Sequence, residues 1–318
     1  MARPQSSRYP GIMLSPSELA RRRLARFGKV VIWGLRTSSH SHRYIHSHFH
    51  EALLRDNINS VWVDDLPDSA DAIAEGDLVI AANVARAHLP ERDRVFYCQH
   101  NFDLEGVSNE YKRELQVFTS GCLRLQDTEK WDPVTVYSRK TRRLYQPWGT
   151  NLAPEEFKPP VASWTRKLPV SFFVGTPWKN DDDGNGNLRE LAQLRRALAH
   201  RMRMLLTASH VSDSTNIRLI RFSCVAPAIG GEWQAHNGYL PCRMFKNVSY
   251  GQLGFSNIKA FGVLFKDATI AADTVDDLLD LAFSLPSVRF REVIRAQQEI
   301  VKQHTYSTKL ANIAKTFE

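Results

Sequence analysis

Short apolar runs alternate with amphipathic stretches along most of the chain. Residues 29–33 consist of a lysine and four apolar residues and are followed by Gly34, which indicates a buried strand. Between residues 42 and 56, Ile45, Phe49 and Leu53 recur at helical spacing. Further strands are predicted at residues 59–63, 77–81, 95–98 and 134–137. This order of strand, helix and strand predicts a parallel sheet with crossover helices.

Turn-forming residues interrupt this pattern between residues 145 and 160. The segment contains Pro147, Gly149 and Pro154, and a Pro-Pro pair follows at 159–160. Such clusters mark loops and domain boundaries. We therefore expect one domain at residues 29–150, a second at residues 151–318, and a separate leader at residues 1–28.

The α/β pattern starts again after this boundary. Residues 168–174 read as a strand that ends at Gly175, and a polar loop follows. Asn187 is expected to open a helix, with Glu190 completing a capping box. Further strands are predicted at 204–207, 217–222 and 262–265, and helices at 275–283, 288–302 and 306–317. Two similar α/β halves joined by a hinge predict a ligand cleft between them.

The composition is that of a globular protein. Hydrophobic residues make up 43% of the 318 residues and charged residues 24%, which excludes a disordered or fibrous chain. No run approaches the ~20 apolar residues that a membrane span needs. The four cysteines (98, 122, 224 and 242) are widely spaced, which argues against a zinc ribbon or a disulfide scaffold. A reducing, cytoplasmic compartment is the simplest expectation.

The net charge of +8 is concentrated at one end. The first 29 residues hold seven basic residues and one acid, so the remaining body is close to neutral. That distribution argues against nucleic acid as a partner. Leu19, Leu24 and Phe27 lie near one side of a possible helix surrounded by arginines, which suggests binding to an anionic membrane surface. A transit peptide and a solvated tail are alternatives for residues 1–28.

Residues 237–257 carry the most informative chemistry. Arg243 and Lys246 are three residues apart, so on a helix they point the same way. Ser249 and Gly251 follow, and glycine lets backbone N–H groups approach a ligand closely. Two cations with N–H donors make a site for a diphosphate. The alternative is a surface helix with two solvated cations and a turn.

This segment resembles the donor-binding region of glycosyltransferases with two Rossmann domains, the GT-B fold. Residues 238–246 are similar to an Arg-x-x-Lys region of that class, residues 147–152 to its interdomain segment, 174–176 to its first donor-domain turn, and 303–306 to its tail. The resemblance implies an α/β fold with two Rossmann-like domains and an interdomain cleft. The donor-binding residues that it implies are Gly175, Thr176, Asn187, Tyr239, Arg243, Lys246, Ser249, Tyr250, Gly251 and Asn257.

The resemblance has one departure. Many GT-B enzymes carry an acidic residue about eight positions after the first cation, whereas this chain has Gly251 and Gln252 there. The subfamily and the stereochemical outcome therefore stay open. The Asp181–Asp183 run resembles a metal-binding motif of the other glycosyltransferase fold, but three acids in a Gly/Asn loop are more often a solvated turn. Because cations and helix dipoles can hold the diphosphate, we expect no cofactor and no metal.

Five of the 11 histidines fall between residues 40 and 50. His42, His46 and His50 share one helical stripe, where a metal site is conceivable, but no known zinc pattern accompanies them. In a GT-B enzyme, a histidine at the acceptor cleft could deprotonate the acceptor hydroxyl. His40, His42 and His100, which follows the fourth strand, are the catalytic candidates. His48 is expected on an exposed helix face.

The sequence thus predicts a glycosyltransferase. It would move a sugar from a nucleoside diphosphate sugar to a hydroxyl of a glycan, a lipid or a small molecule. Two alternatives remain: a non-catalytic protein that binds nucleotide sugars or carbohydrate, and a nucleotide-sugar epimerase. The expected location is cytoplasmic, with association to a membrane surface through residues 1–28.

Overall fold

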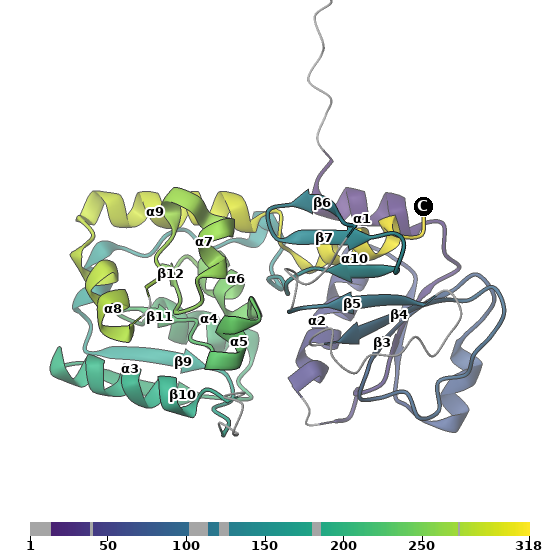
Figure 1. Cartoon of the computed structure of the whole chain (residues 1–318), viewed down its shortest axis with the longest axis horizontal. Coiled ribbons are helices and arrows are strands. Elements are labelled where there is room, and N and C mark those ends of the chain that lie inside the picture. The colour runs from purple at the N-terminus through teal and green to yellow at the C-terminus, as the bar shows by residue number, and fades with distance from the viewer. Residues whose placement is uncertain (1–13, 39–40, 102–113, 121–126, 180–185, 273) are drawn as a thin grey trace, which may run out of the picture.

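The computed structural model describes residues 14–38, 41–101, 114–120, 127–179, 186–272 and 274–318. These residues form two α/β units that lie side by side (Figure 1). The N-terminal unit runs from α1 (Pro16–Leu24) to β8 (Arg143–Tyr145) and also includes the last helix, α10 (Tyr306–Lys315). The C-terminal unit runs from β9 (Val170–Val174) to α9 (Ser287–Val301).

An eight-stranded sheet forms the centre of the N-terminal unit. Its strand order is β2-β1-β3-β4-β5-β8-β7-β6. The first six strands in this order are parallel, and β7 and β6 are added antiparallel at one edge. The strands not yet given are β1 (Val30–Trp33), β2 (Ser60–Val63), β3 (Leu78–Ala82), β4 (Phe96–Asn101), β5 (Leu115–Phe118), β6 (Glu129–Asp132) and β7 (Thr135–Ser138).

Both faces of this sheet are covered, because every residue of β1 and β3 is buried. Val30 and Ile32 pack on one face with α1, α10 and α2 (Ser41–Arg55). Val31 and Trp33 pack on the other face, above a loop that contains the short helix η1 (Pro67–Ala72). Such continuous apolar runs are typical of parallel strands buried on both sides.

The predicted leader contains α1, which is part of the N-terminal core. Ser15 and Glu18 form a capping box at its start. Ala20, Leu24 and Phe27 are buried in the same cluster as the apolar residues of α10. The apolar side of this helix thus packs on protein, Arg21 and Arg22 are exposed, and Arg23 donates to Ala311 O at 3.3 Å. None of the described helices is long and apolar enough to cross a bilayer.

Two pairs of parallel strands organise the C-terminal unit. β9 pairs with β10 (Met204–Ala208), and β11 (Ala226–Pro227) pairs with β12 (Gly254–Phe255). A backbone bond of 2.7 Å from Cys224 N to Val170 O places β11 on the free side of β9. The helices are α3 (Leu188–His200), α4 (Asp213–Arg221), α5 (Glu232–His236), α6 (Cys242–Ser249), α7 (Ala260–Phe265) and α8 (Val275–Ser284), with the 3-10 turns η3 (Pro154–Glu156), η4 (Ser163–Lys167) and η5 (Lys266–Ala268).

The fold class predicted from the sequence is confirmed. The two strand pairs β10-β9 and β11-β12 lie side by side through the bond from Cys224 N to Val170 O. Read in that order, β10-β9-β11-β12, they match the first four strands of the N-terminal unit, β2-β1-β3-β4. Both are doubly wound, Rossmann-like arrangements, in which the chain first adds a strand on one side and then on the other. Two such units are what the GT-B architecture requires.

Three local predictions are wrong. Residues 217–221 belong to α4 and Phe222 is its C-cap, because the Ser212 hydroxyl accepts a bond from Thr215 N at 3.3 Å and starts a helix there. Residues 262–265 belong to α7 rather than to a strand. Asn187 precedes α3, but its side chain accepts from Trp178 N at 3.1 Å and forms no capping box.

The chain crosses between the units twice, at residues 146–153 and 302–305. Thr150 N donates to His304 O at 2.9 Å, and Tyr306 N donates to Thr150 O at 3.2 Å. After the second crossing, α10 returns to the N-terminal unit. Residues 306–315, which the sequence assigned to the C-terminal domain, therefore pack in the N-terminal core.

Candidate functional site

The carboxyl ends of the four C-terminal strands share one edge of their sheet. From β9 the chain passes by way of α3 to β10 on one side, and then by way of α4 to β11 on the other. The strand order therefore reverses at β9. In open α/β sheets, ligands bind outside the carboxyl ends of the strands at such a switch point.

Helix α6 places Arg243 at this switch point. The Arg243 Nε donates to Val174 O at 3.0 Å at the end of β9, and Nη1 lies 3.5 Å from Ile229 O, just past β11. The guanidinium carbon lies 3.9 Å from the centroid of the Phe173 ring. Gly175 has φ +155°, and a Cβ there would overlap the guanidinium, so this glycine leaves room for the cation.

Lys246 lies on the same helix, where it meets the N-terminal unit. The Lys246 side chain is only 7% exposed. Its ammonium donates to the Tyr44 hydroxyl and lies 4.1 Å from the centroid of the Tyr44 ring. Tyr44 comes from α2 and donates in turn to Asp213 Oδ1 at 3.1 Å. The second predicted cation is therefore held between the two units.

Neither cation has a carboxylate within ion-pair distance among the described residues. Burial lowers the pKa of Arg243 and of Lys246, since each charge is partly removed from water. Enclosed charges are normally paired. The site thus has the electrostatics of an anion site, and a guanidinium suits the oxygens of a phosphate.

A cavity of about 720 Å³ opens at the same edge. The segments that follow β9, β11 and β12 supply its polar lining, which consists of Arg189, Glu190, Gln193, Glu232, His236, Asn257 and Lys259. The Asn257 amide bonds both to Gly230 N at 3.0 Å and to Gly230 O at 2.9 Å. Gly230 follows Ile229, which contacts Arg243, so the cavity and the guanidinium are joined along one loop.

The other predicted donor residues have different surroundings. Thr176 is exposed just after Gly175, and the Tyr239 hydroxyl accepts from Trp148 Nε1 at 3.0 Å. Three of them contact the first crossing or the residues that follow it. The Ser249 and Thr150 hydroxyls are 2.7 Å apart, and the Tyr250 hydroxyl donates to Asn151 at 2.9 Å. Gly251 O accepts from Val161 N at 2.8 Å. These three contact the chain between the units rather than Arg243.

The histidines predicted as catalytic lie mostly inside the N-terminal unit. His40 is outside the described residues. His42 and His100 are 1% and 0% exposed, and their rings lie 5.8 and 5.4 Å from that of Trp148. His46 Nε2 lies 3.4 Å from His100 Nδ1. Desolvation, reinforced by the charge of His42, lowers the pKa of His100 to about 3, so this ring is neutral at pH 7.

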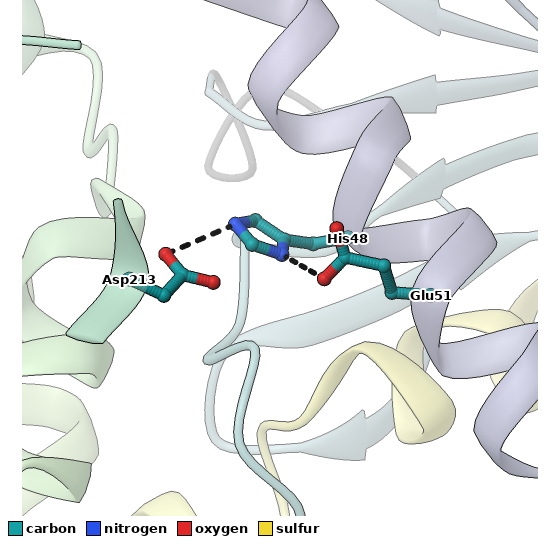
Figure 2. A group of neighbouring side chains, drawn as sticks. All are labelled: His48, Glu51 and Asp213. Atoms are coloured by element: carbon teal, nitrogen blue, oxygen red, sulfur yellow. Dashed lines mark hydrogen bonds and ion pairs between the residues drawn. The ribbon is translucent and has the colours of Figure 1, made fainter. Parts of the chain in front are cut away.

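His48 is buried, against the expectation that it is exposed. It lies between Glu51 on its own helix and Asp213 on α4 of the other unit (Figure 2). No pattern in the sequence indicates this contact, because residues 217–222 read as a strand and nothing predicts a helix at Asp213. Tyr44 was missed for the same reason, since its partners come from the other half of the chain.

No protein-family model matches the chain, and no curated protein matches it in sequence. Three solved structures share part of its shape. The N-terminal domain of Candida albicans trehalose-6-phosphate phosphatase is 11% identical with a TM-score of 0.46, over 88% of this chain and 76% of that one. OtsA without ligand is 10% identical with a TM-score of 0.48, over 87% and 78%. A structure described as trehalose-6-phosphate from E. coli bound with UDP-2-fluoro glucose is 11% identical with a TM-score of 0.48, over 93% and 84%.

Proposed function

We propose that this chain is a GT-B glycosyltransferase that takes a nucleoside diphosphate sugar as donor. One observation carries the proposal: Arg243, half-buried at the switch point of the C-terminal sheet, and Lys246, buried on the same helix against Tyr44, have no carboxylate within ion-pair distance among the described residues. A diphosphate would supply the missing negative charge. The adjoining cavity, reached through Ile229 and Gly230, is where the nucleoside would lie.

The same cations explain how the donor would be activated. Negative charge grows on the diphosphate as the bond to the sugar breaks, and fixed cations in a site of low dielectric stabilise that charge. Lys246 and Arg243 are held by the protein before the donor arrives, so little reorganisation is needed. The proposed transfer therefore needs no metal for the leaving group.

The acceptor would approach from the N-terminal unit, because Tyr44 of that unit contacts Lys246. An inverting transfer needs a base near the acceptor hydroxyl. His40, His42 and His100 remain our candidates for it. The proposed transfer moves a hexose or a deoxyhexose to a hydroxyl of a glycan, a lipid or a small molecule. A peripheral place at the cytoplasmic face of an anionic membrane would use Arg21, Arg22 and Arg26, which are exposed on and just after α1.

The deciding experiment is a binding panel of UDP, GDP, dTDP and CMP, measured by calorimetry and thermal shift on the full chain. One diphosphate should bind and raise Tm. Arg243→Ala should weaken its binding at least tenfold, about 1.4 kcal/mol. Lys246→Met should act in the same direction. Arg195→Ala, which removes an exposed arginine of α3, is the matched control and should leave binding unchanged.

The nucleotide sugar that matches the bound base then tests catalysis. A transferase should release the diphosphate slowly by donor hydrolysis when no acceptor is present. A protein that only binds the donor would release none, and an epimerase would return an epimeric sugar nucleotide. If no nucleoside diphosphate binds, or if Arg243→Ala binds it as well as the wild type, the proposal is wrong.

A further inference from the structure

A cluster of three metal-ligating side chains lies where the two units meet, and the proposed transfer does not use it. His48 and Glu51 come from α2 of the N-terminal unit, and Asp213 comes from the first turn of α4 in the C-terminal unit (Figure 2). One ligand atom from each of the three lies within 4.8 Å of the others. The cluster thus spans the interface between the units.

The imidazole of His48 is held in one orientation. Its Nδ1 lies 2.9 Å from Glu51 Oε2, and the Tyr44 ring packs edge-on against it with centroids 4.2 Å apart. An ionised carboxylate can only accept, so the proton of a neutral ring must be on Nδ1. The lone pair of Nε2 then points away from Glu51 and toward the other unit.

That lone pair faces an acceptor. His48 is 4% exposed, and its Nε2 has no hydrogen-bond partner among the described residues. The nearest charged atom is Asp213 Oδ1 at 3.8 Å, which is too long for a hydrogen bond. Asp213 Oδ2 is already taken by Asn151 Nδ2 at 3.0 Å. With the ring neutral, the Nε2 lone pair and Asp213 Oδ1, which also accepts from the Tyr44 hydroxyl at 3.1 Å, face each other across a partly buried contact, and a cation between them would bind to both.

We infer that His48 Nε2 and Asp213 Oδ1 bind a divalent transition metal ion, with Glu51 orienting the imidazole. Bonds of about 2.0–2.2 Å from a metal to nitrogen and to oxygen span such a gap with a bent angle. A carboxylate on the far nitrogen of a ligating histidine is the usual supporting group of a metal site. One imidazole and one carboxylate suit Zn²⁺ or Mn²⁺. Because its ligands come from both units, the ion would tie α2 to α4.

The test uses the full chain with ZnCl₂ or MnCl₂ as probes, after treatment with a chelator. Equilibrium dialysis with elemental analysis should find one equivalent bound, and Tm should rise with metal concentration. Co²⁺ as a substitute reports a nitrogen and oxygen ligand set through its visible spectrum. Asp213→Asn and His48→Gln should each weaken metal binding at least tenfold.

Matched controls are His200→Gln at the exposed end of α3 and Asp68→Asn in η1, which should bind the metal like the wild type. Asp213 is partly exposed, so Asp213→Asn keeps the test valid if His48→Gln does not fold. The inference is overturned if the chain binds no equivalent, or if both variants bind as the wild type does. Nucleoside diphosphate binding, measured with chelator present, stays a separate result, so either proposal can fail alone.

Discussion

The guanidinium of Arg243 occupies space that only a glycine at position 175 leaves open. Most of its contacts are to backbone carbonyls and to the Phe173 ring, so its position depends on close packing rather than on an ion pair. A small change of shape at residue 175 should therefore move the cation without removing it.

Gly175→Ala is the corresponding prediction. The added Cβ would overlap the guanidinium, and φ +155° is unfavourable for alanine. We expect nucleoside diphosphate affinity to fall about tenfold, ~1.4 kcal/mol, as measured by calorimetry. Gly262→Ala in α7, where a Cβ meets only Thr269 at 3.9 Å, is the control. Equal affinities for the two variants would contradict the role of Gly175.

The buried histidines should make the protein sensitive to acid. Desolvation lowers the pKa of His100 from 6.5 to about 3, and the pKa of His46 is lowered in the same direction. As pH falls below 6.5, the unfolded chain binds protons that the folded chain refuses. Each such histidine then removes about 1.4 kcal/mol of stability per pH unit.

In His100→Gln, the unfolding free energy should fall less steeply as the pH is lowered, because one fewer proton is taken up on unfolding. Urea unfolding at pH 7, 6 and 5 gives the slope of the unfolding free energy against pH, and His200→Gln on the surface of α3 is the matched control. A His100→Gln slope equal to that of the wild type would mean that this ring is not kept neutral.

The sequence predicts which residues lie together where they share one face of a single helix. Arg243 and Lys246 share a face of α6 because they are three residues apart. Asp213, His48 and Tyr44 could not be brought together this way, because contacts between elements distant in the chain decide their positions. Ser249 and Gly251 were predicted to help bind the diphosphate, but in the structure they contact the chain between the units.

At the scale of elements, hydrophobic pattern found the long helices and the central strands. α2, α3, α8, α9 and α10 and strands β1 to β4 lie where periodicity predicts them. The misses were short. β11 and β12 have two residues each, too few for a pattern, and α4 carries alternating apolar residues that its serine cap overrides.

Helix α10 should stabilise the unit to which it returns. Leu310 is fully buried among residues of α1, α2 and the sheet, so Leu310→Ala should lower the unfolding free energy by about 2–5 kcal/mol. Leu54→Ala on the exposed side of α2, where the leucine is 55% exposed, should cost far less. Denaturant titration of both variants makes the comparison. Similar losses would show that α10 packs more loosely than the structure has it.

At the scale of the whole molecule, the packing of α10 should hold the two units together even when the chain between them is cut. Residues 1–152 contain the N-terminal sheet, and residues 153–318 contain the C-terminal unit with α10. We expect the two fragments to copurify when they are produced together, because α10 inserts its apolar face into the other fragment. A second fragment that ends at residue 304 should not copurify with the first. Equal recovery of both would contradict this account.

The paired crossings also decide how the molecule can move. The two crossing segments run parallel at Thr150 and Thr305, where Thr150 N donates to His304 O and Thr150 O accepts from Tyr306 N. The segments are therefore held together at one point. A hinge motion that separates the two units would bend both crossing segments together. A rotation of one unit against the other would break the backbone hydrogen bonds between the segments. Any rearrangement that admits or releases a ligand should therefore rock the two units about these crossings, and it would change the contact between Lys246 and Tyr44, which come from different units.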